Sequence, residues 1–399
     1  MEKIIEKFRS KLNHTSLGFI RSLMDHINWE SRMIGIKGAR GVGKTTLMLQ
    51  YIKKHYEHDP SVLYASLDDI WFSGNKLVDM ADRFAKQGGK VLFLDEVHKY
   101  PEWSRELKNI YDDFPELKIV FTGSSLLEIL NSRADLSRRA VVYTMQGLSF
   151  REYLNLEMGL KLNAYTLDDI ILNHLNYSGE ITSLLKPLKY FQRYLQAGYY
   201  PFYREIPELY FVRLGETINM IIEIELPLLR GVDISYSSKL KQMLLIISES
   251  APFIPNISKL SERIGINRNT FISYMNFLME AGLLRNLYRD AHGITRLQKP
   301  EKVFLENTNI AHALGIQFPD KGNLRETFFA NQLSYTHPLT IPEKGDFMTS
   351  DGRVFEIGGV NKDNRQFNKD NIKNGFIASD DIEFGNRNKI PLWMFGFLY

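Results

Sequence analysis

The chain has 399 residues, which predicts roughly two to four domains, and its 44% hydrophobic and 24% charged residues are typical of a globular protein. The absence of cysteine excludes disulfides, thiolate zinc sites and cysteine nucleophiles, and it favours the cytoplasm as the compartment. A net charge of +3 does not by itself indicate a nucleic-acid partner, and no apolar run approaches the roughly 20 residues of a membrane helix.

Short apolar segments alternate with helical patterns in the first part of the chain. The expected strands are residues 33–37, 62–66, 91–95, 117–123 and 140–145. Strands that are apolar along their whole length and alternate with helices predict a parallel sheet covered on both faces. The fold class is therefore α/β, with a three-layer domain in residues 1–148.

The stretch GARGVGKT, residues 38–45, fits the phosphate-binding pattern GxxxxGK[ST] and lies between an expected strand and an expected helix. The expected nucleotide loop comprises Gly38, Ala39, Arg40, Gly41, Val42 and Gly43. Its glycines let the backbone N–H groups point at phosphate oxygens. We expect Lys44 to reach the β and γ phosphates of ATP as a catalytic residue, Thr45 to bind Mg²⁺, and Thr46 to add a phosphate contact.

The stretch VLFLDE, residues 91–96, predicts the second half of an ATPase site. Asp95 is expected at the carboxyl end of a buried strand, where it would hold Mg²⁺ through water, and Glu96 would act as the general base for the attacking water. At the end of the next strand, Thr122 and Ser124 are both candidates for a polar sensor of the γ phosphate. A role in a simple turn is the alternative for each.

Three arginines follow the expected sensor strand, Arg133, Arg138 and Arg139. One of them could serve as an arginine finger, and an exposed surface position is the alternative for each. His98 and Lys99 follow the acidic pair and are interpreted as structural or coupling residues.

Residues 149–238 have helical patterns, and residues 239–298 predict three helices and a hairpin, as in a winged helix. The side chains expected at the start and outer face of the third of these helices are Asn267, Arg268, Asn269, Ser273 and Tyr274. The basic residues of the expected wing are Arg285, Arg289, Arg296, Lys299 and Lys302. This face predicts DNA binding. Docking onto neighbouring domains or a protein partner is an equal alternative.

The stretch GDFMTSDGRVFEIGG, residues 345–359, predicts a hairpin with a three-residue loop. Counting outward from the loop pairs Asp346 with Glu356, and Glu326 is a candidate third acid. These acids resemble the site of PD-(D/E)xK nucleases, which bind a divalent metal. The motif lysine is replaced by Gly358, and Lys362 is expected beyond the strand, so we expect a degenerate nuclease site. The alternative is one exposed acid and one acid that forms a salt bridge with a nearby basic residue.

Several segments resemble the prokaryotic AAA+ type ATPases whose C-terminal half is a domain of unknown function. The segments are KGARGVGKTTL, LFLDEVHKYPEW, KIVFTGSS, LSRRAVVYTMQGLSFREYL and the GYYP turn at residues 198–201. The resemblance implies an AAA+ core in residues 1–148, a helical lid in 149–238, a winged helix in 239–298 and a nuclease-like α+β domain in 299–399. Where this family often has a second arginine in the loop, this chain has Gly41. Where the family has glycine, this chain has Arg138, so the resemblance does not fix the arginine finger.

These observations predict an Mg²⁺-dependent ATPase whose cycle drives motion between domains, with DNA as a candidate partner. The alternative function is a slow nucleotide-dependent switch that binds a protein partner. An arginine finger supplied by a second copy would require a homo-oligomer. An active nuclease is the least favoured prediction, because the motif lysine is missing.

Overall fold

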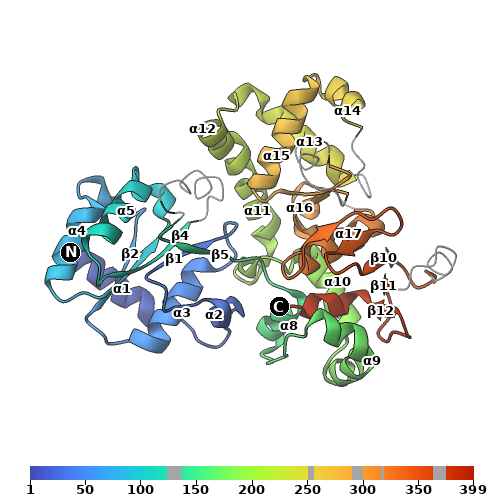
Figure 1. The fold of residues 1–399 in the computed structure, drawn as a ribbon, viewed down its shortest axis with the longest axis horizontal. Coiled ribbons are helices and arrows are strands. Elements are labelled where there is room, and N and C mark those ends of the chain that lie inside the picture. The colour runs from blue at the N-terminus through green and yellow to red at the C-terminus, as the bar shows by residue number, and fades with distance from the viewer. Residues whose placement is uncertain (124–135, 137, 250–255, 290–299, 316–318, 363–373) are drawn as a thin grey trace. The chain divides into compact units, whose positions relative to one another are not determined.

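The computed structural model describes the chain except for residues 124–135, 137, 250–255, 290–299, 316–318 and 363–373 (Figure 1). Two compact units make up the chain, Met1–Gly147 and Leu148–Tyr399. The first unit ends one residue before the expected end of the core at residue 148. Each unit has its own sheet, and each is described separately below.

The first unit contains a five-stranded sheet in the order β2-β3-β4-β1-β5, with every neighbouring pair parallel. Its strands are β1 (Met33–Lys37), β2 (Val62–Ser66), β3 (Val91–Asp95), β4 (Lys118–Gly123) and β5 (Val141–Thr144). The predicted parallel sheet is confirmed, and the strand ends differ from the predicted ones by one residue at most. The apolar runs form strands because all but the edge strand β5 are buried along nearly their whole length.

Helices cover both faces of this sheet. They are α1 (Glu2–Asn13), α2 (Leu23–His26), α3 (Lys44–Tyr56), α4 (Leu77–Lys86) and α5 (Trp103–Asp113). Figure 1 shows α4 with α5 on one face and α1 with α3 on the other. Because the strands are parallel, the carboxyl ends of β1, β3 and β4 meet at one edge of the sheet, which is where α/β folds of this kind place ligands.

The second unit begins with helices and ends with a mixed sheet. Its helices are α8 (Phe150–Met158), α9 (Leu167–Leu184), α10 (Pro187–Ala197), α11 (Tyr210–Met220), α12 (Leu226–Arg230), α13 (Ser237–Glu249), α14 (Ile257–Ile264), α15 (Arg268–Glu280), α16 (Thr308–Ala313) and α17 (Lys321–Leu333). The antiparallel pair β6 (Leu284–Leu287) and β7 (Lys302–Leu305) follows α13, α14 and α15. This is the element order expected of a winged helix.

A second five-stranded sheet has the order β12-β11-β10-β9-β8. Its strands are β8 (Leu339–Thr340), β9 (Phe347–Thr349), β10 (Val354–Gly358), β11 (Gly375–Ser379) and β12 (Lys389–Pro391). The β9–β10 hairpin pairs Phe347 with Phe355, which is the predicted register. Gly352 in its loop has a φ of 81°, the left-handed conformation that suits glycine in a three-residue hairpin loop.

Contacts distant in sequence unite the second unit. Ser149 caps α8, and its hydroxyl donates to the main-chain oxygen of Tyr399 at 2.6 Å. The Nε of Arg151 donates to the same oxygen at 2.9 Å. The segments expected as lid, winged helix and C-terminal domain therefore pack into one compact unit.

Asn309 in α16 is the centre of a buried polar network and has 0% exposure. Its Oδ1 accepts from the Tyr199 N–H at 2.9 Å and from the Tyr210 hydroxyl at 2.6 Å. Its Nδ2 donates to the carbonyls of Tyr194 at 3.2 Å and Leu195 at 2.9 Å. These bonds use both donors and both lone pairs of the amide, so one side chain ties α16 to α10 and α11.

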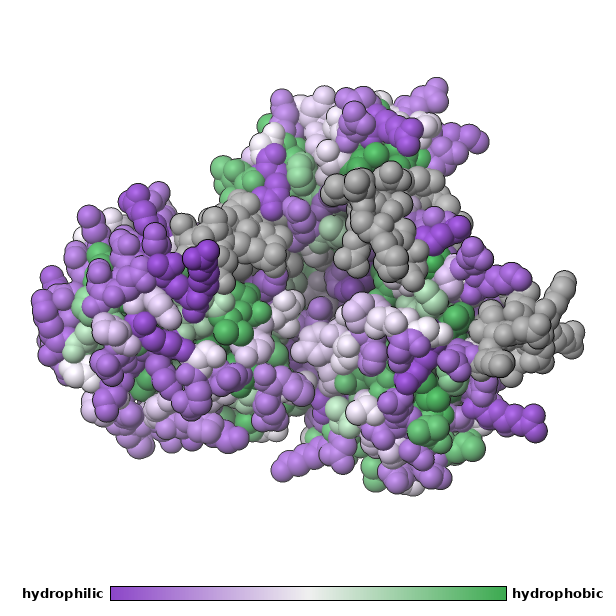
Figure 2. All heavy atoms as spheres, in the orientation of Figure 1, coloured by the Kyte–Doolittle hydropathy of each residue, from purple (hydrophilic) through white to green (hydrophobic). Residues whose placement is uncertain are grey.

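Apolar side chains reach the surface over α12, as the hydropathy view shows (Figure 2). Val212, Ile224, Leu228 and Ile234 are each more than half exposed. Among the described residues, no helix is both long and apolar enough to cross a membrane.

Replacing Asn309 by Leu should lower the free energy of unfolding of the second unit by about 2–4 kcal/mol, because buried groups of Tyr199, Tyr210, Tyr194 and Leu195 would each lose a hydrogen bond. Denaturant titration of the full chain would measure this loss. The exposed Asn269→Leu is the matched control and should change stability by less than about 0.5 kcal/mol. Equal stability of the two variants would show that the network is not important for stability.

Candidate nucleotide site

The phosphate loop requires glycine for two different reasons. Gly41 and Gly43 have φ angles of 84° and 99°, in the left-handed region. Gly38 lies against the chain after β5, and a Cβ there would be 2.3 Å from the carbonyl oxygen of Met145. Since α3 begins at Lys44, the positive end of its dipole lies at the loop. This geometry suits a phosphate group.

Lys44 folds back over the loop from the first turn of α3. Its Nζ donates to the carbonyls of Gly38 at 2.9 Å and Ala39 at 3.0 Å, and the residue is only 4% exposed. The ammonium is therefore held above the loop, where phosphate oxygens would be stronger acceptors than these carbonyls. Thr46 is the third residue of the same helix.

The carboxylate of Asp95 brings the loop and the strand ends together. Its Oδ2 accepts from the hydroxyl of Thr45 at 2.7 Å and from the hydroxyl of Tyr64 at 2.8 Å. Its Oδ1 accepts from the hydroxyl of Thr122. Thr45 and Asp95 lie 50 residues apart in sequence, and their contact is the arrangement that the two motifs predict for a magnesium site.

Tyr64 was not predicted as a site residue. It lies in β2, next to β3, and burial together with the negative charge of Asp95 raises the pKa of its phenol. The hydroxyl therefore stays protonated and can only donate to that carboxylate. A tyrosine in an otherwise apolar strand beside the acidic strand was the available signal.

Glu96 adopts a left-handed backbone conformation, with a φ of 52°. Such a conformation costs a non-glycine residue about 1–3 kcal/mol and is concentrated at functional sites. Its N–H donates to Asp95 Oδ1 at 3.1 Å and to Thr122 Oγ1 at 3.3 Å. The backbone of Glu96 is thus fixed to the same carboxylate that contacts the loop.

Of the two candidates for a polar sensor, the structure describes only Thr122. Thr122 is fully buried and contacts Asp95 and Glu96, so the structure places it within the site. Ser124 lies outside the described residues.

Arg139 lies at the amino ends of the parallel strands, whereas the phosphate loop lies at their carboxyl ends. Its Nε and Nη2 donate to the carboxylate of Asp112 at 2.9 and 2.7 Å. It precedes β5, which runs parallel to β1, so it is separated from the loop by a five-residue strand, about 17 Å. Arg138 is exposed and Arg133 lies outside the described residues. Within one chain, the geometry does not bring Arg139 to the nucleotide.

Arg21 connects the phosphate loop to the end of the first unit. Its Nη1 donates to the carbonyl of Val42 in the loop at 2.7 Å. Its Nη2 donates to the carbonyls of Gln146 and Gly147, each at 2.8 Å, immediately before the second unit begins. Arg21 is 6% exposed, and no sequence pattern indicated this role because the contact exists only in the folded unit.

Only some of the side chains expected on the DNA-binding face of the winged-helix segment are exposed to solvent. Tyr274 was expected to face outward, which is wrong: it is 8% exposed and packs against Tyr236. The inward face of α15 includes Phe271, Tyr274, Met275 and Leu278, a register that places the tyrosine on the core side. Residues 267, 268, 269 and 273 are exposed.

Three basic residues of the expected wing lie within the described part of the chain, and each forms a salt bridge with an acidic residue. Arg285 pairs with Glu306, and Arg289 pairs with Glu301 at 3.2 Å. Lys302 is buried, as described below. Arg296 and Lys299 lie outside the described residues.

Lys302 lies between two of the three candidate nuclease acids. Its Nζ is 3.2 Å from Glu326 Oε2 and 3.1 Å from Asp346 Oδ1, and both Lys302 and Glu326 are 8% exposed. Burial, and next the charge of Asp346, raises the pKa of Glu326 to about 7. The ammonium thus occupies the space between these carboxylates. Among the described residues, no group of three or more His, Cys, Asp or Glu side chains could hold a metal ion.

The third acid, Glu356, also has a lysine partner. Lys362 lies beyond β10, as expected, but its side chain turns back and its Nζ pairs with Glu356. A Cβ at Gly358 would lie 2.8 Å from the Cβ of Lys362, so the lysine side chain covers the glycine. The alternative of one exposed and one salt-bridged acid is met only in part, because Asp346 and Glu356 both pair with lysines and Glu356 is only 6% exposed.

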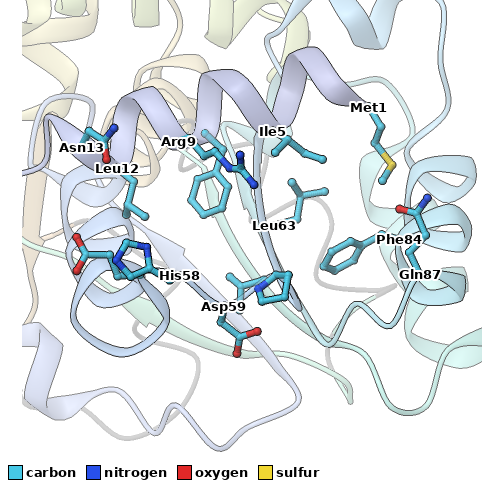
Figure 3. A pocket seen from close by; sticks show the side chains of 14 residues that line it. Met1, Ile5, Arg9, Leu12, Asn13, His58, Asp59, Leu63, Phe84 and Gln87 are labelled. Atoms are coloured by element: carbon cyan, nitrogen blue, oxygen red, sulfur yellow. The ribbon is translucent and has the colours of Figure 1, made fainter.

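A cavity of about 560 Å³ lies elsewhere in the first unit (Figure 3). Figure 3 shows α1 along one side of it, with Leu63, Phe84 and His58 on the other. None of its lining residues belongs to the phosphate loop or to the acidic strand end. It is therefore separate from the candidate nucleotide site.

Comparisons with known proteins agree with this geometry. Residues 30–154 match the family described as "AAA domain", and residues 188–321 match a domain of unknown function, DUF8612. An uncharacterized protein of Methanocaldococcus jannaschii is 28% identical over 410 residues, which cover 93% of this chain and 85% of that protein.

Two solved structures are also similar to this chain. A Walker-type ATPase of Pyrococcus abyssi has 12% identity and a TM-score of 0.41, covering 78% of this chain and 95% of that one. The Orc1 protein of Aeropyrum pernix in complex with DNA has 14% identity and a TM-score of 0.32, covering 78% and 92%. The family match and the parallel sheet lead to one conclusion: residues 30–154 are similar to the AAA-domain family, and this part of the chain has the P-loop NTPase fold of AAA+ proteins.

Proposed function

We propose that the chain is an Mg²⁺-dependent ATPase whose nucleotide cycle drives motion between its two units. The observation that carries the proposal is the carboxylate of Asp95, which accepts from Thr45 of the phosphate loop at 2.7 Å and is directly followed by Glu96. A hydroxyl and a carboxylate this close together are oxygen ligands of the kind that would hold Mg²⁺.

The proposed roles follow from these positions. The loop amides and Lys44 hold the phosphates of ATP, and Thr45 and Asp95 hold Mg²⁺, which neutralises phosphate charge when bound. Glu96 accepts a proton from water as the water oxygen bonds to the γ phosphorus. The bond from that phosphorus to the bridging oxygen breaks, and ADP and phosphate leave.

Arg21 and Met145 support the proposed coupling between nucleotide and interdomain motion. Any shift of the loop that moves the carbonyl of Val42 changes a charge-assisted hydrogen bond of the guanidinium that also holds Gly147. The close approach of Gly38 to the Met145 carbonyl provides a second connection to the same segment. A slow switch that exposes a surface to a protein partner would use these contacts too, and differs only in its turnover rate.

Arg139 lies at the amino ends of the strands of its own sheet, so it is proposed to act as an arginine finger only for a second copy of the chain. Among the described residues, the candidate surface for DNA is the start of α15, with Arg268 and Asn269 exposed. Nuclease activity is not proposed, since lysines pair with the three acids.

Replacing Lys44 by Ala should abolish tight ATP binding, because the buried ammonium that meets the phosphates is lost. Replacing Glu96 by Gln should preserve ATP binding and lower kcat by roughly 10²- to 10³-fold, because the amide cannot accept the proton. Equilibrium binding of a fluorescent ATP analogue and phosphate release would measure the two effects. Wild-type turnover in the Glu96→Gln protein would contradict the assignment of the base.

The position of Lys302 leads to a prediction about metal binding by Glu326 and Asp346. In a Lys44→Ala background, Mn²⁺ should leave the thermal unfolding of the chain unchanged, because the Lys302 ammonium already pairs with Glu326 and Asp346 and occupies the space between them. Adding Lys302→Met should create a response, with Mn²⁺ raising Tm by several degrees, on the order of 1–2 kcal/mol.

The exposed Lys321→Met, in the helix that carries Glu326, is the matched control and should not create a response to Mn²⁺. Stabilisation by Mn²⁺ with Lys302 intact would mean that the acids bind metal beside the lysine.

A further inference from the structure

His98 is a buried histidine beside the proposed general base. Its side chain is 6% exposed, and its Nε2 lies 3.4 Å from Glu96 Oε2. Neither ring nitrogen makes a hydrogen bond within the part of the chain that the structure describes. Buried polar groups are nearly always hydrogen-bonded, so such a ring beside an acid in an ATPase site calls for a functional explanation.

The backbone brings the two side chains together. The strand β3 ends at Asp95, and the left-handed conformation of Glu96 reverses the chain into a single 3-10 turn, Val97–Lys99. Val97 is fully buried and anchors this turn. This turn brings the His98 ring beside the Glu96 carboxylate, two residues earlier in the chain. The strained φ of Glu96 therefore helps to position the ring.

The surroundings keep the imidazole neutral. Burial lowers the pKa of His98 to about 3, and the positive charges of Lys99, Lys44 and Arg40 act in the same direction. A neutral imidazole carries one N–H. With the hydrogen on Nε2, the ring is a donor to the carboxylate, whereas the other tautomer would place a lone pair against a negative oxygen.

We propose that His98 is a positioning residue for ATP hydrolysis, and that its Nε2–H donates to Glu96 and holds the carboxylate oriented toward the attacking water. This proposal rests on the proposed ATPase function. The 3.4 Å separation is long for a hydrogen bond, and catalytic hydrogen bonds of this kind often shorten only in the reacting complex. His98 acts on the reaction only through Glu96.

A matched pair of variants separates hydrogen bonding from packing. His98→Gln keeps an N–H donor on a side chain of similar length, and His98→Met has a similar length without a donor. Turnover of Mg²⁺·ATP by the full chain should fall roughly 10- to 100-fold in kcat for the Met variant, with KM within about 3-fold of wild type. The Gln variant should recover most of kcat.

A double-variant cycle tests whether His98 acts through Glu96. In a Glu96→Gln background, His98→Met should change the residual rate by less than about 2-fold, because its effect depends on the carboxylate. Far-UV circular dichroism would establish that each variant is folded.

The outcomes are distinct for the two proposals. A Met variant with wild-type kcat, a Gln variant as slow as the Met variant, or an undiminished Met effect in the Glu96→Gln background would each overturn the role of His98. A wild-type chain that does not hydrolyse ATP, or hydrolyses it unchanged after Glu96→Gln, would instead overturn the proposed function.

Discussion

The guanidinium of Arg21 holds together the two parts of the first unit on which the proposed mechanism depends. It donates to the carbonyl of Val42 in the phosphate loop and to the carbonyls of Gln146 and Gly147, the last residues before the second unit. The next residue, Leu148, is fixed within the second unit, because its N–H donates to the Tyr199 carbonyl at 2.7 Å. The connection between the units is therefore anchored on both sides, and one of its anchors contacts the nucleotide loop.

The nucleotide site is assembled around a second shared group, the carboxylate of Asp95. Hydroxyl groups from three other elements donate to it, and the N–H of Glu96 adds a fourth hydrogen bond. Four hydrogen-bond donors offset much of the cost of burying this carboxylate. The same arrangement fixes Glu96 in a strained conformation, and this strain brings His98 beside the base. Binding, metal coordination and proton transfer are thus proposed to share one rigid strand end.

The sequence predicted the elements whose signals are local. Apolar strands, the glycines of the loop and the turn at Gly352 follow from short-range rules, and the β9–β10 register follows from counting across that turn. Contacts between distant segments could not be predicted in this way. The hydrogen bonds of Tyr64 and Arg21 depend on strand order and chain packing, and the outward placement of Tyr274 was wrong because its helix turns that position to the core. The lysines that pair with the hairpin acids come from a strand 44 residues away and from a side chain that turns back on its own strand.

The most direct test of nucleotide-driven motion is energy transfer between one dye on each unit. The chain has no cysteine, so Lys86→Cys and Leu172→Cys, both at exposed positions, provide the only labelling sites. At saturating nucleotide, transfer efficiency should differ between ADP and ATP in a Glu96→Gln background, and the difference should disappear on adding Arg21→Met. Arg32→Met removes another arginine that donates to main-chain carbonyls of the first unit, and it should keep the difference. Equal transfer efficiencies in ADP and ATP for the Glu96→Gln protein would contradict the account. A difference that remains unchanged after Arg21→Met is added would contradict it too.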